Sequence, residues 1–396
     1  MAKPGWFRAR VLLFVAGVGC AAACSSAGPP DPGGGGAKDG GGEGAGGRGG
    51  GLPRGGSVGI LAIARKGHTG TLLPDGRILI AGGTGTDGVL ATTEIYDPET
   101  GQAHPAGDLA EPRVDHQATL LLDGSVLITG GSNGTESLAT AEIYDPAYRL
   151  FVRAGSMTSP RRGHTATVLE DATILIVGGR GNAGRAVAQA EVYDPGEDAF
   201  APAGDLVFAR WGHQATSLRR GSVLITGGQQ EGTSGDVADL ADSELYSVPE
   251  RAFRRTAPMG IARAFHRATR LTGERVLITG GMAAGAPSGG AEIFDSTTQA
   301  FAAAGDLVVP RALHAATLLR DGTLLLTGGH TGAGALASVE RWRADGGGGF
   351  APAADLGTGR AGHTATLLPD GRVLIAGGGA TLAEGDALAS VEIYRH

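Results

Sequence analysis

Cysteine is scarce in this chain. Only Cys20 and Cys24 occur among its 396 residues, and none follows residue 24. A folded body downstream of residue 24 therefore forms no disulfide, and its stability has to come from packing. Cysteine is also excluded there as a metal ligand or a catalytic nucleophile.

Long apolar runs and concentrated positive charge are missing as well. The longest apolar segment covers residues 11–23, whereas a membrane-spanning helix needs about 20 apolar residues. The formal net charge is -7, and lysine and arginine form no run that would face a nucleic acid. We therefore expect no transmembrane helix and no nucleic-acid partner.

The first residues have the order of an export signal. Lys3, Arg8 and Arg10 make a basic start, and the apolar segment 11–23 follows. Small residues then lead into Cys24. This order is typical of a signal peptide that is removed after export.

The stretch AAACSS around Cys24 resembles the lipobox of bacterial lipoproteins. The resemblance implies that residues 1–23 are the signal peptide, that Cys24 is lipidated and that a lipid anchor is the only membrane contact. Cys20 is the alternative lipidation site, and an ordinary secretory signal is the alternative interpretation. The expected location is the bacterial outer membrane or cell surface, with the periplasm or secretion as alternatives.

Glycine dominates residues 24–56, as in GGGGAKDGGGEGAGGRGGG. Such a segment has almost nothing apolar to bury, so we predict a disordered linker. At about 5–6 Å × √n, a glycine-rich tether of this length has an r.m.s. length of roughly 30 Å. The folded domain is predicted to cover residues 57–396.

That domain repeats a pattern seven times, at spacings of 48 to 53 residues. The tetrad Arg-x-x-His opens each copy, at Arg65 and His68, Arg113 and His116, Arg161 and His164, Arg210 and His213, Arg263 and His266, Arg311 and His314, and Arg360 and His363. A glycine pair follows each histidine after fourteen residues, and then a glutamate recurs, at Glu94, Glu142, Glu191, Glu244, Glu292, Glu340 and Glu392. Such self-similarity is the sequence signature of a repeat architecture.

Each copy predicts four short strands and no helix. HTATLLPDGRVLIAGG indicates a hairpin with a tight turn at Asp370 and Gly371, SVEIY indicates a third strand, and a segment around a phenylalanine indicates a fourth. Four-stranded units of about 50 residues are typical of propeller blades. The seventh copy ends after its third strand, and the segment from Ser57 to Leu61 aligns with a fourth strand. We predict an all-β, seven-bladed propeller whose N-terminal strand completes the last blade.

The order of Gly-Gly, Glu-x-Tyr-Asp-Pro and a downstream aromatic resembles the kelch repeat of the galactose-oxidase-like propeller superfamily. The resemblance covers residues 57 to 396. It departs from the family pattern in the fourth strand, where the usual tryptophan is phenylalanine, or Ala103 in the first copy. The copper oxidases of this family use a tyrosine crosslinked to cysteine, so the absence of cysteine beyond residue 24 excludes that class.

Residues present in every copy are best explained as structural. We predict that each repeated arginine pairs with a glutamate of its own or a neighbouring blade, because packed blades desolvate both groups. The alternative for the histidines is a ring of imidazoles around a metal ion. A seven-membered ring is too wide for one tetrahedral ion, so no metal and no cofactor is expected.

Function is expected where the copies differ. Phe208, Trp211 and Phe265 stand off the repeat register, in the loops that enter copies four and five. The fourth copy also has the longest connection from glycine pair to glutamate, which contributes Gln229, Gln230, Glu231, Asp236, Asp239 and Asp242. These residues are the predicted binding patch. The alternatives are that the aromatics fill space between blades, and that the three aspartates hold calcium or are a solvated acidic loop.

We therefore predict a monomeric binding module for a protein or glycan, and not an enzyme. The alternative is a carbohydrate-active enzyme of the metal-free sugar mutarotase type, since propellers host several activities. His330, alone in its loop, is the nearest candidate for a catalytic group.

Overall fold

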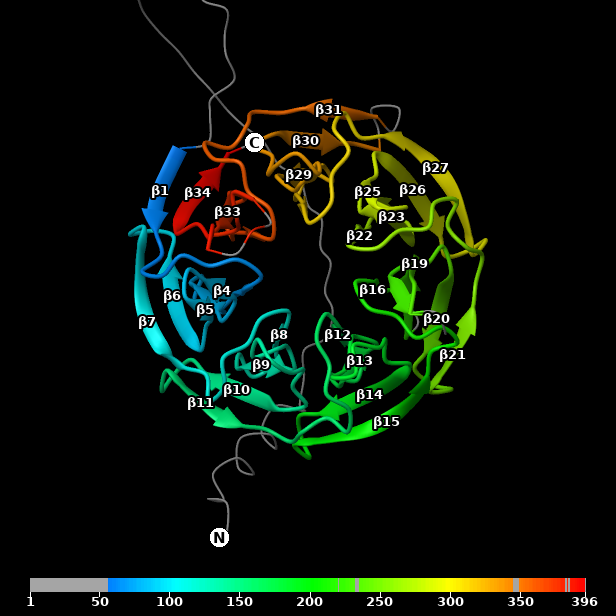
Figure 1. The fold of residues 1–396 in the computed structure, drawn as a ribbon, viewed down its shortest axis with the longest axis horizontal. Helices are drawn as coiled ribbons and strands as arrows, with labels where there is room; N and C mark the ends of the chain where they lie inside the picture. The colour runs from blue at the N-terminus through cyan, green and yellow to red at the C-terminus, as the bar shows by residue number, and fades with distance from the viewer. Residues whose placement is uncertain are drawn as a thin grey trace, which may run out of the picture. The chain divides into compact units, whose positions relative to one another are not determined.

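The computed structural model describes residues 56–219, 221–231, 235–344, 349–381, 383 and 385–395. These residues form strands and turns without a helix, so none of them makes a helix that could cross a membrane. Seven four-stranded sheets stand in a ring, with strands such as β8 and β16 toward the centre and β7 and β21 at the rim (Figure 1). The predicted seven-bladed all-β propeller is confirmed.

Blades 1 to 4 follow the chain from the innermost strand outward. Their strands are β2 (Thr69–Leu72), β3 (Ile78–Ala81), β6 (Thr92–Asp97) and β7 (Gln102–Asp108); β8 (Gln117–Leu120), β9 (Val126–Thr129), β10 (Ala141–Asp145) and β11 (Leu150–Arg153); β12 (Thr165–Val168), β13 (Ile174–Val177), β14 (Gln189–Asp194) and β15 (Ala199–Asp205); and β16 (Gln214–Ser217), β17 (Ser222–Thr226), β20 (Ser243–Ser247) and β21 (Ala252–Arg255).

Blades 5 to 7 repeat this order. Their strands are β22 (Arg267–Arg270), β23 (Arg275–Thr279), β26 (Gly290–Asp295) and β27 (Ala300–Asp306); β28 (Ala315–Leu318), β29 (Leu324–Thr327), β30 (Val339–Trp342) and β31 (Phe350–Pro352); and β32 (Thr364–Leu367), β33 (Val373–Ala376), β34 (Ser390–Tyr394) and β1 (Gly56–Ile60). Two-stranded ribbons lie between second and third strands, formed by β4 (Thr84–Gly85) with β5 (Gly88–Val89), β18 (Gln229–Glu231) with β19 (Val237–Asp239), and β24 (Met282–Ala283) with β25 (Ala286–Pro287).

The core lies between blades rather than inside one. Every residue of β3 is buried, because successive side chains of a strand point to opposite faces and both faces meet a neighbour. Leu79 and Ala81 pack against blade 2, beside Ile128, whereas Ile78 and Ile80 pack against blade 7. A run of apolar residues without alternation is therefore what a second strand requires.

The phenylalanine of the fourth strand packs on the aromatic residue of the third strand. The ring centroids of Tyr193 and Phe200 are 4.8 Å apart, at an interplanar angle of 45°. The same pairing occurs in blades 2, 4 and 5. Phenylalanine thus supplies the aromatic contact that holds the outer strand in these blades.

The N-terminal strand closes the ring, as predicted. β1 pairs antiparallel with β34, with Ser57 opposite Glu392 and Ile60 opposite Ser390 (Figure 1). Leu61, just after β1, is buried in the cluster between blades 7 and 1. Closure covers the edge of β34, which would otherwise be unpaired. The predicted signal peptide, the lipidation at Cys24 or Cys20, and the linker up to residue 55 lie outside the described residues.

Candidate functional site

The repeated arginine and glutamate form a buried clamp in every blade. The predicted pairing is confirmed within each repeat, with N–O distances of 2.5 to 2.8 Å in the pairs Arg65–Glu94, Arg113–Glu142, Arg161–Glu191, Arg210–Glu244, Arg263–Glu292, Arg311–Glu340 and Arg360–Glu392. All seven arginine side chains are fully buried. Burial lowers their pKa, and the glutamate beside each one opposes that shift.

Blade 3 shows what the clamp holds. Arg161 Nη2 donates to Glu191 Oε1 at 2.8 Å, while Nη1 donates to the carbonyls of Gly178 at 2.9 Å and Gln189 at 2.8 Å. The second oxygen, Glu191 Oε2, accepts the backbone N–H of Thr158 at 2.8 Å. The clamp therefore ties the loop that enters a blade to the second and third strands of that blade. Desolvated charges are satisfied on both sides, as a buried pair requires.

The repeated histidines join each blade to the one before it. His164 Nε2 lies 2.9 Å from Thr129 Oγ1 of blade 2, and equivalent contacts of 2.8 to 3.2 Å occur for the other six. Burial lowers the pKa of His68, His116 and His213 to about 3, with a nearby arginine adding to the effect. The imidazoles are neutral and serve as contacts between blades.

The close approach of each histidine to the preceding blade also explains why a glycine pair is required there. Gly178 has φ of 61°, and a Cβ there would lie 2.5 Å from the carbonyl oxygen of Arg210 and 2.7 Å from His213 Cε1. Its neighbour Gly179 has φ of 101°, and a Cβ there would lie 3.0 Å from the Arg162 carbonyl oxygen. Any larger side chain would therefore separate adjacent blades or displace the loop that enters the blade.

Two loops of every blade meet at one end of its strands, which we call the loop face. The residue after each repeated arginine forms an antiparallel bridge with the residue after the glycine pair, as in Arg162 with Arg180 and Trp211 with Gln229. The hairpin turns of the first and third strands lie at the other end of the strands, which we call the turn face. The entering loop and the connection after the glycine pair therefore share one face of the propeller.

The last residue before each repeated histidine has a left-handed backbone at the loop face. Gly67, Gly163, Gly212 and Gly362 occupy this position in four blades, with φ between 59° and 65°. In the other three blades the residues are Asp115, Phe265 and Leu313, with φ of 55°, 54° and 54°. A residue with a Cβ in this conformation costs roughly 1–2 kcal/mol. Backbone bonds link neighbouring members, since Phe265 N donates to Gly212 O at 2.8 Å.

Two of the three predicted aromatics come together on the loop face. The rings of Trp211 and Phe265 meet edge to face, with centroids 5.3 Å apart at 73°. The guanidinium of Arg180 lies over the Trp211 ring at 4.9 Å from its centroid. Both rings are partly exposed. Blades 3, 4 and 5 thus each contribute one side chain to this cluster.

Phe208 does not join that cluster, so the predicted patch of three aromatics and the long connection is wrong on this point. Its backbone N–H donates to Glu244 Oε1 at 3.2 Å as part of the clamp. Its ring instead lies under the guanidinium of Arg255 on the outer strand β21, 5.0 Å from the centroid. Asp242 belongs to the same outer group, since its carboxylate pairs with Arg255 at 2.6 Å.

The long connection of the fourth copy forms the β18–β19 ribbon. Gln229 Nε2 donates to Asp239 Oδ1 across the ribbon at 2.9 Å, and Gln230 stands opposite Ala238. Glu231 pairs with Arg180 at 3.3 Å and accepts the backbone N–H of Ala186 at 2.6 Å. The ribbon is therefore tied to blade 3 through the arginine that covers Trp211.

The three aspartates of this connection do not gather around one point. Asp239 Oδ2 accepts the backbone N–H of Ala284 in blade 5 at 2.9 Å, Asp242 pairs with Arg255, and Asp236 is exposed. Across the described part of the chain, no three His, Cys, Asp or Glu side chains are placed to hold a metal ion. The arrangement of these aspartates does not fit calcium.

Arg180 is the member of the cluster that the sequence pattern missed. It follows the glycine pair of the third copy, where the other copies have Thr84, Ser132, Gln229, Met282, His330 and Gly379. Arg180 is the only charged residue at this position in the seven copies, and that difference could have marked it as a candidate site residue. His330 itself lies in the equivalent bridge with Ala312, and its Nδ1 accepts the N–H of Gly332 at 2.8 Å.

No protein-family model and no curated protein matches this chain. Among solved structures it is similar to a novel fungal alcohol oxidase with catalytic diversity among the AA5 family, in complex with copper. The TM-score is 0.66 at 16% sequence identity, covering 86% of this chain and 75% of the oxidase. A likeness at that identity shows the fold.

The expectation that the protein is not an enzyme is contradicted, because a solved structure with the same fold is a copper alcohol oxidase. The absence of cysteine beyond residue 24 excluded only the copper oxidases that use a tyrosine crosslinked to cysteine. It does not exclude other classes of enzyme. Among the described residues of this chain, no three His, Cys, Asp or Glu side chains are placed to hold a copper ion, and the seven repeated histidines are buried against threonines. We therefore derive no step that involves copper.

Proposed function

We propose that this protein is an exported, lipid-anchored kelch-type propeller that binds a protein or glycan ligand at the loop face of blades 3 to 5. The observation that carries the proposal is the Trp211–Phe265 pair, held in place by a strained backbone at Phe265. The repeat pattern and the seven blades support the kelch assignment. The basic start, apolar segment and AAACSS stretch support export and the anchor.

The conformation of Phe265 favours a functional role only together with the contact of its ring to Trp211, because Asp115 and Leu313 share the conformation without being aromatic. Glycine occupies its position in four other blades without cost, whereas a bulky residue with φ of 54° is strained. Such strain persists where the surroundings impose it, and it is concentrated at functional sites. At Phe265 the strain places an aromatic ring at the edge of Trp211.

The groups around the pair suit recognition of an amphipathic ligand. Two partly exposed aromatic rings provide an apolar platform, and Arg180 and Glu231 provide charged hydrogen-bonding groups beside it. Aromatic rings stack on the apolar faces of sugars, and they are also the commonest anchors of protein interfaces. The contacts therefore support a glycan and a protein ligand alike.

Phe265→Gly tests this site without weakening the fold. We expect the variant to keep or slightly raise the thermal midpoint, because glycine relieves the left-handed strain. We expect it to lose at least about tenfold in ligand affinity, which corresponds to about 1.4 kcal/mol. The measurement is a glycan array and a pull-down with the recombinant propeller, followed by titration of the best ligand.

Leu313→Gly is the matched control, since Leu313 has the same strained conformation in the next blade. It should keep the affinity unchanged. Equal binding by the wild type and Phe265→Gly would exclude this site. Following each bound sugar by NMR also detects conversion, which is the outcome expected for a sugar isomerase.

The anchor has its own test. Cys24→Ser should abolish incorporation of labelled palmitate and release the protein from the membrane fraction, because the lipobox-like stretch then lacks its acceptor thiol. Cys20→Ser is the control and should leave both properties unchanged. The reverse result would assign lipidation to Cys20, and labelling of neither site would leave a secretory signal.

A further inference from the structure

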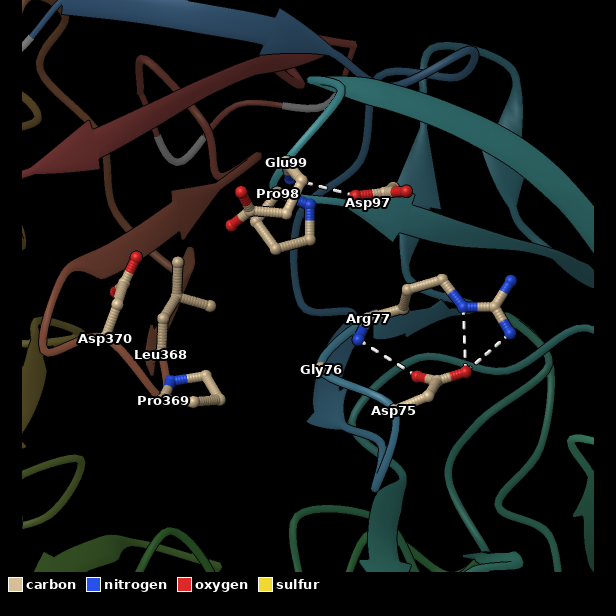
Figure 2. Close-up of a pocket in the computed structure, with 9 residues that line it drawn as sticks. All are labelled: Asp75, Gly76, Arg77, Asp97, Pro98, Glu99, Leu368, Pro369 and Asp370. Carbon is tan, nitrogen blue, oxygen red and sulfur yellow. Dashed lines mark hydrogen bonds and ion pairs between the residues drawn. The ribbon is translucent and has the colours of Figure 1, made fainter.

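The turn face carries equivalent clefts between neighbouring blades. One lies between blades 7 and 1, where Leu368, Pro369 and Asp370 face the turns of blade 1 (Figure 2). Another, with a volume of about 550 Å³, lies between blades 4 and 5. In each cleft the first hairpin of one blade faces both hairpins of the next blade.

The two clefts differ in charge. The cleft between blades 7 and 1 is lined by four carboxylates and one guanidinium: those of Asp75, Asp97, Glu99, Asp370 and Arg77. Figure 2 shows Asp370 on one wall and Asp75 with Arg77 on the other, and the Asp75–Arg77 pair is 2.5 Å long. Arg372 beside the cleft pairs with Asp370 and, at 2.9 Å, with Glu99, so four carboxylates meet two guanidinium groups and the cleft remains acidic.

The cleft between blades 4 and 5 has the opposite sign. Arg219 and Arg254 line it, and Glu274 is the one acidic residue among its lining side chains. Glu274 is already engaged, because it pairs with Arg219 at 2.9 Å and with Arg270 at 3.4 Å. The Glu274 carboxylate is thus paired with two guanidinium groups, and Arg254 adds a further positive charge to the cleft wall, which leaves an excess of positive charge.

The remaining lining groups are suited to hold a polar ligand. Arg254 is exposed and donates one N–H to Gln299 Oε1 at 2.9 Å, so most of its five donors remain. Ser222 and Thr297 add hydroxyl groups at the walls, and the buried side chain of Leu245 forms part of the floor. Guanidinium groups bind carboxylate and sulfate oxygens in pairs of hydrogen bonds.

We propose that the cleft between blades 4 and 5 binds an anionic saccharide through sulfate or carboxylate groups held by Arg219 and Arg254. Its volume lies in the range of small-ligand sites, about 300–1,000 Å³. The hydroxyl and amide groups of its walls match sugar hydroxyls, and the apolar floor matches a sugar ring. The site is on the turn face, so it is separate from the Trp211–Phe265 pair of the loop face.

Calorimetric titration of the purified protein with a sulfated disaccharide tests the proposal. We expect saturable binding that weakens with added salt. Arg254→Gln and Arg219→Gln should each lower the affinity at least about tenfold, the effect of losing a charge-assisted hydrogen bond. Both arginines are exposed, so the variants should retain the wild-type thermal midpoint.

Two control variants match the two arginine variants. Arg77→Gln in the acidic cleft and Leu313→Gly on the loop face should leave the affinity unchanged. Unchanged binding by Arg254→Gln would overturn the proposal. It would also be overturned if a neutral disaccharide without sulfate or carboxylate groups, or inorganic sulfate alone, bound as tightly as the sulfated sugar.

Discussion

At the scale of residues, one threonine in each blade pairs with the histidine of the next blade. It sits either directly after the blade's own histidine or directly before the glycine pair, and these two positions face each other across the first two strands. Blades 1, 3 and 7 use the first position, with Thr69, Thr165 and Thr364, and the others use the second, with Thr129, Thr226, Thr279 and Thr327. Side chains at these two facing positions can reach the same imidazole, so a threonine at either position is enough to bond the histidine of the next blade.

This exchange predicts a rescue experiment. Thr129→Val should lower the free energy of unfolding by about 1–3 kcal/mol, because the buried His164 Nε2 loses its partner. Adding Gln117→Thr, directly across the strands, should restore most of that loss. The comparison is made by urea unfolding, with Thr135→Val on an exposed loop as control. A double variant no more stable than Thr129→Val would contradict the exchange.

At the scale of elements, β1 is the piece that turns an open arc of blades into a closed ring. It supplies the outer strand of blade 7, and the residues after it extend the contact into blade 1. Leu61 is buried there, and Glu94 accepts the backbone N–H of Ala62 at 2.7 Å. One short segment therefore completes a sheet, a core cluster and a buried clamp.

Deleting residues 57–63 should therefore lower the thermal midpoint sharply. The deletion exposes the edge of β34, opens the cluster around Leu61 and leaves the Glu94 carboxylate with Arg65 but without two N–H donors. The measurement is a calorimetric scan of the purified chain. A chain lacking residues 1–51 is the control and should keep the wild-type midpoint. An equal midpoint for the 57–63 deletion would show that the ring is held by other contacts.

At the scale of the whole molecule, seven neutral histidines make the ring sensitive to acid. Burial lowers the pKa of each one, to about 3 for His68, His116 and His213, while an unfolded chain has histidines with a pKa of about 6.5. Between these values the unfolded chain binds protons that the folded ring cannot bind. Stability is therefore complete above the unfolded pKa and is lost as the pH falls below it.

The free energy of unfolding should thus fall steadily from pH 6.5 to pH 4.5, by up to about 1.4 kcal/mol per pH unit for each histidine. Urea unfolding across this range measures the slope. His164→Gln should reduce the slope by one histidine's share, whatever its effect on stability at neutral pH. His104→Gln, on the exposed strand β7, is the control. Stability that stays flat over this range would refute the burial of neutral imidazoles.

Most of the fold could be predicted from the sequence because its signals are local. Apolar second strands, the glycine pair and the Asp-Gly turn recur in register. Each can be interpreted from the residues beside it in the chain or by comparison with an equivalent copy. The clamp between Arg161 and Glu191 could also be predicted, since both groups recur and both need a partner when buried. The candidate site was harder to predict from the sequence. Phe208 and Trp211 are only three residues apart in the chain, yet their side chains contact different elements.

The sequence by itself determined the number of blades, their four strands and the closure by residues near Ser57, because a sevenfold pattern leaves one consistent way to bury its apolar strands. The tertiary structure alone decided which unique side chains meet. Trp211, Phe265 and Arg180 come from three blades, and Arg219 and Arg254 frame a cleft whose acidic counterpart lies between blades 7 and 1. Such contacts depend on how adjacent blades are packed and on the backbone angles of single residues. The repeat pattern in the sequence specifies neither of these.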